Sequence, residues 1–148
     1  MFPIVEMCGD DYDEVLALWQ RCEGVGLSPS DSREGVRSFL LRNPGLSLVA
    51  RQDERIVGAV LCGHDGRRGY LYHLAVDSPW RRQGLGQALV EACLSRLAAA
   101  GILKATIVVF THNQDGQRFW SRLGWKQRAD LVVLQQEPAH RPDSGGKL

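Results

Sequence analysis

Hydrophobic positions along the chain recur at two spacings, and segments of the two kinds interleave. Apolar side chains at helical spacing predict helices at residues 10–22, 32–41, 85–100 and 114–123. Short apolar or β-branched runs between turn residues predict strands at residues 46–50, 56–62, 69–76, 105–110 and 131–134. The run at 69–76 does not alternate cleanly, which is typical of a strand covered on both faces. This order of elements predicts a mixed α/β sheet with helices on both faces.

The 148-residue length fits a single domain, which we place at residues 1–137. Residues 138–148 (PAHRPDSGGKL) carry no aromatic side chain, and we predict a flexible C-terminal tail there. The first residues show no basic leader, and no segment approaches the roughly 18 apolar residues that cross a bilayer. We therefore expect a cytoplasmic protein with no membrane partner.

Eighteen basic and seventeen acidic residues leave a formal net charge of +1. This balance argues against a nucleic-acid partner, because such proteins usually carry a strongly basic face. The four cysteines include no C-x-x-C pair and no cluster with histidine, so the sequence suggests neither a metal site nor a disulfide framework. We expect free thiols and no metal.

The turn at residues 76–87 (VDSPWRRQGLGQ) joins a predicted strand to the longest predicted helix. The first N–H groups of a helix lack intrahelical partners and favour anions, phosphate above all. Gly84 and Gly86 would let the backbone approach a ligand, and Arg81 and Arg82 would add charge. The same glycines can serve the bend alone, and the arginines can simply be solvated.

Two motifs in this order resemble the GCN5-related N-acetyltransferases, which bind acetyl-CoA. The first is Arg81-Arg82-Gln83-Gly84-Leu85-Gly86, which matches R/Q-x-x-G-x-G/A and follows a strand that ends in residues 74–76. The second is Asn113 followed by Phe119-Trp120 and then by residues 123–125 (LGW). The resemblance covers about residues 3–137. It implies a twisted, mostly antiparallel sheet of about six to seven strands flanked by about four helices.

The resemblance also implies residues that bind acetyl-CoA as a co-substrate. Leu74 and Val76 would pair with the pantetheine arm, and the N–H of Ala75 or Val76 would stabilise the oxyanion. The turn would hold the pyrophosphate with Arg81, Arg82, Gln83, Gly84, Leu85, Gly86 and Gln87. Asn113 would lie near the pantetheine or cap the helix that follows it, or do both. Trp120 would lie at the cofactor as well.

Proton transfer is where the sequence departs from the family. The family's usual acid, a tyrosine, is replaced by Trp120, whose indole cannot protonate a thiolate. A glutamate that several relatives carry five residues before Asn113 is replaced by Val108. Two tyrosines of the 69–76 strand are then candidates.

We expect Tyr70 and Tyr72 to share a strand face with Leu74 and Val76. They would handle protons there, or else form aromatic walls of the acceptor pocket. His73 would point to the opposite face, where we expect it to be buried under a helix.

The resulting hypothesis is an acetyl-CoA-dependent N-acetyltransferase that acts on a primary amine of a small molecule or a protein by direct attack in a ternary complex. The alternative is a non-catalytic acyl-CoA-binding or sensing module, which the missing tyrosine and glutamate motivate. The identity of the acceptor cannot be read from the chain, and the resemblance leaves a homodimer open.

Overall fold

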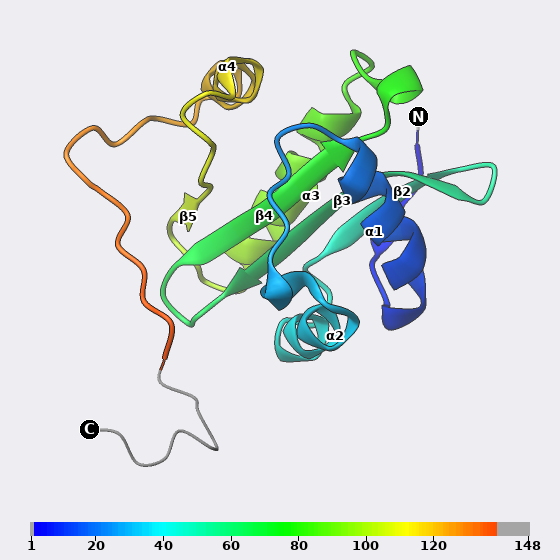
Figure 1. Cartoon of the computed structure of the whole chain (residues 1–148), viewed down its shortest axis with the longest axis horizontal. Coiled ribbons are helices and arrows are strands. Elements are labelled where there is room, and N and C mark those ends of the chain that lie inside the picture. Colours follow the sequence, from blue (N-terminus) through cyan, green and yellow to red (C-terminus); the bar gives the residue numbers. More distant parts are fainter. Residues whose placement is uncertain (1, 139–148) are drawn as a thin grey trace.

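The computed structural model describes residues 2–138 and shows a twisted sheet with helices on both faces (Figure 1). Its strands follow one another in the order β1-β2-β3-β4-β5, antiparallel except for the parallel pair β4 and β5. The strands are β1 Ile4–Glu6, β2 Leu48–Gln52, β3 Arg55–His64, β4 Gly69–Val76 and β5 Ala105–Thr106. The described residues thus confirm the α/β class with five strands, fewer than the six to seven expected. Residues 139–148 of the predicted tail lie outside the described range.

Helices α1 (Tyr12–Arg21) and α2 (Arg33–Arg42) cover one face of the sheet, and α3 (Leu85–Ala99) covers the other (Figure 1). α4 (Gln114–Arg122) lies beyond β5. All four helices agree with the predicted positions. Short 3-10 turns at η1 (Gly9–Asp11), η2 (Pro29–Asp31) and η3 (Ser78–Trp80) connect these elements. None of the helices among residues 2–138 has the length and apolar character needed to cross a membrane.

Local sequence explains where these elements begin and turn. The β2–β3 hairpin turns through Asp53 and Glu54, which both have positive φ, as a two-residue hairpin of the primed type requires. Ser32 caps α2 by accepting a hydrogen bond from the N–H of Gly35 at 3.0 Å. Asn113 caps α4 in the same way through the N–H of Gly116.

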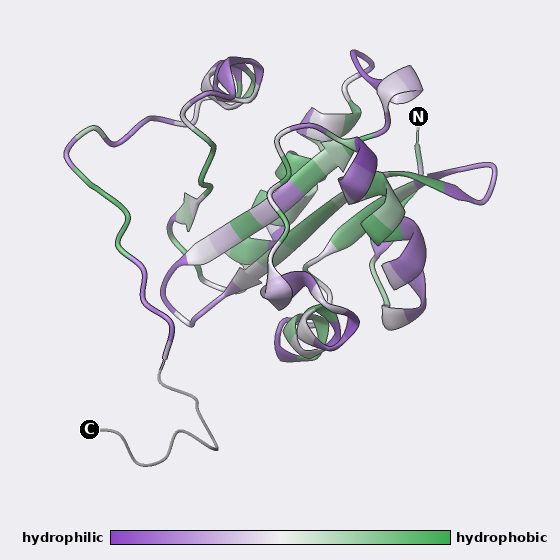
Figure 2. Cartoon of the chain, viewed as in Figure 1, coloured by the Kyte–Doolittle hydropathy of each residue, from purple (hydrophilic) through white to green (hydrophobic). Residues whose placement is uncertain are grey.

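Two apolar clusters, one on each face, hold the sheet. On the α3 face, Val57, Val60 and Leu71 pack with Leu89 of the helix. On the α1–α2 face, residues from both helices pack over β2 and β3, and Trp19 is the largest fully buried side chain among them. Figure 2 shows β2 and β3 as largely hydrophobic strands. Burial on both sides explains why β3 is apolar along nearly its whole length.

The prediction was wrong at both ends of the chain. β1 pairs with β2 although no strand was expected there, because three residues are too few to show a period. The strand expected at 105–110 is reduced to β5, and residues 131–134 pair with no strand among the described residues. Those four apolar side chains are exposed on an extended segment, green in Figure 2. The two valines among them favour an extended backbone, but a ladder also needs a neighbouring strand.

A β-bulge in β4 changes which side chains share a face. Ala75 pairs with Ala59 of β3 and Tyr72 pairs with Leu61, so β4 holds one more residue than β3 between these pairs. His73 lies in the bulge with φ +55°. As a result, Tyr72 contacts Phe39 of α2, whereas Leu74 and Val76 pack against the α3 cluster. The prediction that Tyr70 and Tyr72 share a face with Leu74 and Val76 was therefore wrong, and the bulge also explains the missing alternation.

Candidate functional site

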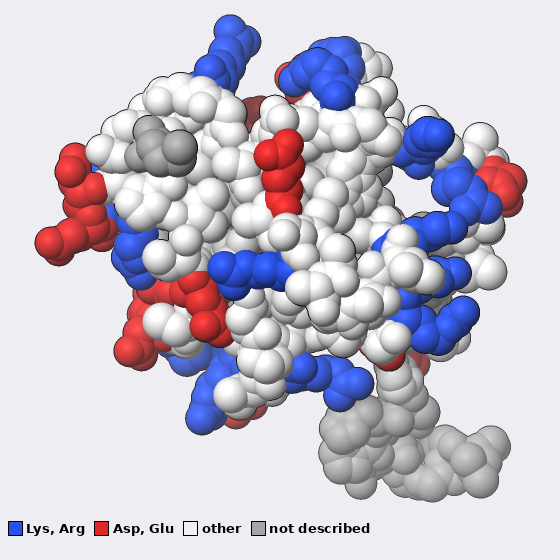
Figure 3. Space-filling view, turned by 180° about the vertical axis from the view of Figure 1, so that it is seen from behind, with Lys and Arg blue, Asp and Glu red and all other residues white. Residues whose placement is uncertain are grey.

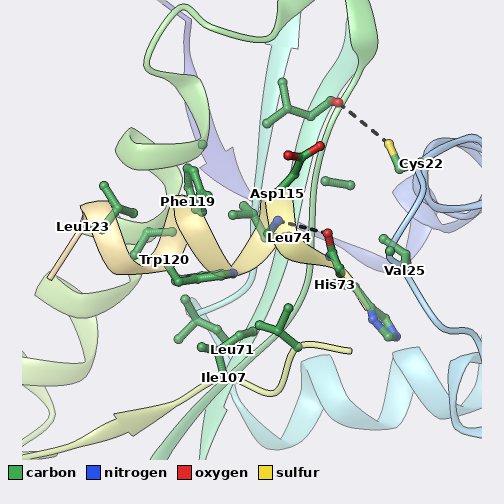
Figure 4. Close-up of a pocket in the computed structure, with 18 of the residues that line it drawn as sticks. Cys22, Val25, Leu71, His73, Leu74, Ile107, Asp115, Phe119, Trp120 and Leu123 are labelled. Atoms are coloured by element: carbon green, nitrogen blue, oxygen red, sulfur yellow. Dashed lines mark hydrogen bonds between the residues drawn. The ribbon is translucent and has the colours of Figure 1, made fainter. Parts of the chain in front are cut away.

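A cleft of about 1450 Å³ opens where β5 separates from β4. The two strands pair only at Gly69 and Tyr70, so no strand within residues 2–138 lies beside the rest of β4 on that side. Residues 22–26 after α1, the turn at 80–87, the segment 107–110 and α4 form the remaining walls. Figure 4 shows Phe119, Trp120 and Leu123 on one side of β4, and Val25 and Cys22 on the other.

Backbone N–H and C=O groups of β4 point into this cleft. The N–H of Asp77 donates to the carbonyl of Val57 on β3 at 2.8 Å. Since successive residues of a strand direct their N–H and C=O groups to opposite sides, those of Val76 point away from β3. The Val76 carbonyl accepts a hydrogen bond from Nε of Arg81 at 2.8 Å and lies 3.7 Å from Sγ of Cys22. The N–H of Val76 is thus directed into the cleft.

The turn between β4 and α3 is fixed at its start by a carboxylate. Asp77 is buried, caps η3 through the N–H of Ser78, and binds Arg21 with two hydrogen bonds of 3.0 Å. The hydrogen bonds and charge of Arg21 lower the pKa of Asp77 below its usual range, so it is ionised at neutral pH. This ion pair holds the chain where it leaves the sheet for the turn.

The end of the turn exposes the first N–H groups of α3. Arg82 and Gly84 have positive φ values of 63° and 82°, and α3 begins at Leu85. A Cβ on Gly84 would meet nothing within 4 Å, so this backbone faces open space. A Cβ on Gly86 would lie 3.2 Å from the ring of Phe119, which shows that Gly86 also allows α4 to approach α3.

The structure brings most of the predicted cofactor residues to the cleft wall. They are Leu74, Ala75, Val76, Arg81, Arg82, Gly84, Leu85, Gly86, Gln87, Asn113 and Trp120. Gln83 is not part of that wall, and its amide lies near the carbonyl of Pro79. The guanidinium of Arg81 is engaged by the Val76 carbonyl and by Cys22.

Asn113 and Trp120 both have structural partners. The Asn113 Oδ1 accepts the N–H of Gly116 at 2.9 Å, which confirms the predicted cap. Its Nδ2 would lie 2.7 Å from a Cβ on Gly24, so the loop after α1 passes close to the start of α4. Trp120 is buried and stacks edge-on against Phe119 and Trp125. It closes the cleft with an apolar wall.

Of the two candidate tyrosines, only Tyr72 lines the cleft. Tyr70 stacks on Tyr72 with ring centroids 6.2 Å apart and lies outside the lining. Burial, and the neighbouring Tyr70, raise the pKa of Tyr72 above its usual value. The phenol therefore stays protonated near neutral pH, which suits a hydrogen-bond donor and not a base.

His73, which the sequence placed on the opposite face from Tyr72, lies on the same face because of the bulge. Its ring stacks edge-on against Trp19 of α1 and its Nε2 lies 2.9 Å from Oδ1 of Asp31. The expected packing under a helix is present, and the side chain is 17% exposed. His73 is also part of the cleft wall. No sequence signal located the bulge beyond the imperfect alternation of the strand.

Charge near the site is mixed. Figure 3 shows that basic and acidic side chains are interspersed on the back of the molecule, as the small net charge suggests. Within residues 2–138, no group of three or more histidine, cysteine and acidic side chains is placed to hold a metal ion.

The sheet thus opens between β4 and β5, and a basic turn leads from this opening to the N-terminus of α3. The family model for the acetyltransferase (GNAT) family matches residues 12–125, and the chain belongs to this family. An acetyltransferase from Sodalis glossinidius is 31% identical over 126 residues, which cover 84% of this chain and 87% of that protein. Relatives of this kind support an acetyltransferase activity.

Solved structures share the fold at low sequence identity. Ard1 from Thermoplasma volcanium matches with a TM-score of 0.76 at 22% identity, covering 86% of this chain and 84% of that chain. The aminoglycoside N-acetyltransferase AAC(6')-Iy in complex with CoA matches with a TM-score of 0.75 at 16% identity, covering 94% and 96%.

Proposed function

We propose that the cleft binds acetyl-CoA and that the protein transfers the acetyl group to a primary amine of a small molecule or protein, which attacks directly in a ternary complex. The observation that carries the proposal is the path from the cleft-facing backbone of β4 to the N-terminus of α3. An extended arm with amide groups fits the first part, and a diphosphate fits the second.

The residues present fit this co-substrate. The backbones of Leu74 and Val76 would pair with the arm, while the N–H groups from Arg82 to Gln87 would hold the diphosphate. Gly84 leaves the backbone open at that point, since a Cβ there would project into free space. When bound, acetyl-CoA supplies a thioester carbonyl. The N–H of Val76 would donate to the oxygen that develops negative charge, whereas that of Ala75 faces β3, as the N–H of Asp77 does.

The acceptor pocket would lie on the α1–α2 side of β4, next to residues 22–26. A small-molecule amine is supported by the aminoglycoside acceptor named for one structural neighbour. The acidic side chains that line the cleft are Glu23, Asp115 and Glu91, and they come from three different elements.

An amine panel read by release of the CoA thiol tests the function. The protein should bind acetyl-CoA and release thiol at least tenfold faster with one or more primary amines than without an amine. Secondary and tertiary amines of matched size are the controls.

The second candidate is a non-catalytic acyl-CoA-binding module. It is favoured by Trp120 and Val108, which stand where the family has its usual tyrosine and, in several relatives, a glutamate. Val108 is 61% exposed, and its side chain has no polar atom that could move a proton. Tight binding of acetyl-CoA with no amine-dependent thiol release across the panel would support this module instead. The mass of the protein in solution, measured by light scattering with and without acetyl-CoA, tests whether the homodimer that the family resemblance leaves open forms.

A further inference from the structure

We propose that His73, oriented by Asp31, accepts the proton that the acceptor amine must lose before it attacks. The inference rests on the proposed acetyl transfer and names a proton acceptor for it. His73 would be the catalytic residue and Asp31 a positioning residue.

The position of His73 is strained and held from several sides. His73 is a non-glycine residue in the left-handed region, and such positions persist only where neighbours fix them. Here Nε1 of Trp19 donates to the His73 carbonyl at 3.1 Å, and the Trp19 and His73 rings lie 5.0 Å apart. The bulge turns the imidazole to the α1–α2 side, the same side of β4 as Val25 in Figure 4.

Asp31 is built to orient this ring. Its side chain is 10% exposed, its Oδ1 lies 2.9 Å from Nε2 of His73, and its Oδ2 accepts the N–H of Ser28 at 3.0 Å. The Asp31 carbonyl accepts the hydroxyl of Tyr12 at 2.6 Å, which fixes the backbone as well. A carboxylate is only an acceptor, so Nε2 carries the hydrogen. The neutral ring therefore has its lone pair on Nδ1.

Nδ1 has no hydrogen-bond partner among residues 2–138. No buried side-chain nitrogen or oxygen in that part of the chain lacks a partner, so Nδ1 is not buried. Since His73 belongs to the cleft wall, this nitrogen can be reached from the cleft directly or through a water molecule.

Asp31 of η2 is the ionisable group bonded to His73. The other ionisable groups of the cleft wall with His73 include Tyr72 of β4, Glu23 of the loop after α1, Asp115 of α4 and Glu91 of α3. α1 presents Trp19, which does not titrate. Because burial keeps Tyr72 protonated, the imidazole nitrogen with its free lone pair is the group of this set suited to take a proton from an amine.

The step balances as follows. One proton of the ammonium group moves to Nδ1, and the neutral amine forms a C–N bond to the thioester carbonyl. The C–S bond then breaks with its electron pair on sulfur, and the thiolate takes the second proton from the new amide nitrogen. The third hydrogen stays on the amide, and His73 releases its proton to water. The products are an N-acetyl amine, the CoA thiol and one proton.

Two variants of His73 test its role, because asparagine and glycine both accept a left-handed backbone. In H73N, the Kd for acetyl-CoA should stay within about twofold, while kcat falls about 100-fold or more, the usual contribution of a general base. The acidic limb of the kcat–pH profile should disappear. H73G should regain activity when imidazole is added. The matched control H64N removes a histidine of the β3–β4 turn and should keep kcat and the limb.

D31N tests the positioning role. It should lower kcat and move the acidic limb to lower pH, because the imidazolium loses its charged partner. A wild-type kcat and limb in H73N, or an unshifted limb in D31N, overturns the inference. If H73N and H73G do not fold, the D31N profile decides alone. A wild-type protein that neither binds acetyl-CoA nor releases thiol contradicts the proposed function instead, so the two failures are distinguishable.

Discussion

The ion pair between Asp77 and Arg21 gives the sharpest stability prediction, because it fixes the turn that leads to α3. In D77N the shape is kept and the charge is lost. Each hydrogen bond to a charged group contributes about 1.5–3 kcal/mol when buried. Asp77 is buried but the Arg21 side chain is 42% exposed, so water compensates part of the loss. We expect the free energy of unfolding to fall by about 1–2 kcal/mol at pH 7.

Urea unfolding of both proteins as a function of pH checks this value. The folded-state pKa of Asp77 is lowered, so its stabilisation is complete above the unfolded pKa of about 3.9 and is lost as pH falls through the folded pKa. The two unfolding curves should therefore converge under acidic conditions.

The matched control is D13N. The side chains of Asp13 and Arg33 form an ion pair at 79% and 61% exposure. This variant should change the free energy of unfolding by less than about 0.5 kcal/mol. A D77N loss equal to that of D13N, or one that persists unchanged at pH 2–3, would refute the reasoning.

Three further changes test other parts of the structure. G84A and G66A both place a Cβ at positive φ in open space, so each should lower the free energy of unfolding, measured with urea, by about 1 kcal/mol. Calorimetry should show weaker acetyl-CoA binding only for G84A. Equal affinities of the two variants would contradict the role of the turn. L71A removes a fully buried side chain and should cost about 2–5 kcal/mol, and a loss below 1 kcal/mol would contradict the packing of β4 on α3. Cys93 is buried, and its contact with a neighbouring thiol and its burial raise its pKa. A thiol reagent should therefore label exposed Cys8 in the native protein and Cys93 only after unfolding, as read by mass spectrometry. Rapid labelling of Cys93 in the native protein would show that the core opens.

Sequence patterns recovered the helices because each has both a periodic apolar face and a local stop or cap. Ser32 and Asn113 are examples, since their capping bonds involve neighbours three residues away. The turn at residues 76–87 was recognisable for the same reason, because its residues are contiguous, and its role in holding a diphosphate stays a prediction.

Long-range pairing was not recoverable in the same way. Residues 131–134 have strand character, yet strand formation depends on a neighbour elsewhere in the chain. The bulge at His73 likewise arises from the register of β4 against β3, and this register sets which side chains face α1 and α2. The contact between His73 and Asp31 spans 42 residues and leaves no local pattern.

Titration of isotope-labelled protein with acetyl-CoA, followed through backbone amide resonances, tests the central claim most directly. The largest shifts should fall on the amides of residues 74–76 and 82–87, in a saturable 1:1 titration, with little change in the β2–β3 hairpin. The absence of saturable shifts, or shifts centred on another part of the molecule, would contradict acetyl-CoA binding along β4 and the N-terminus of α3.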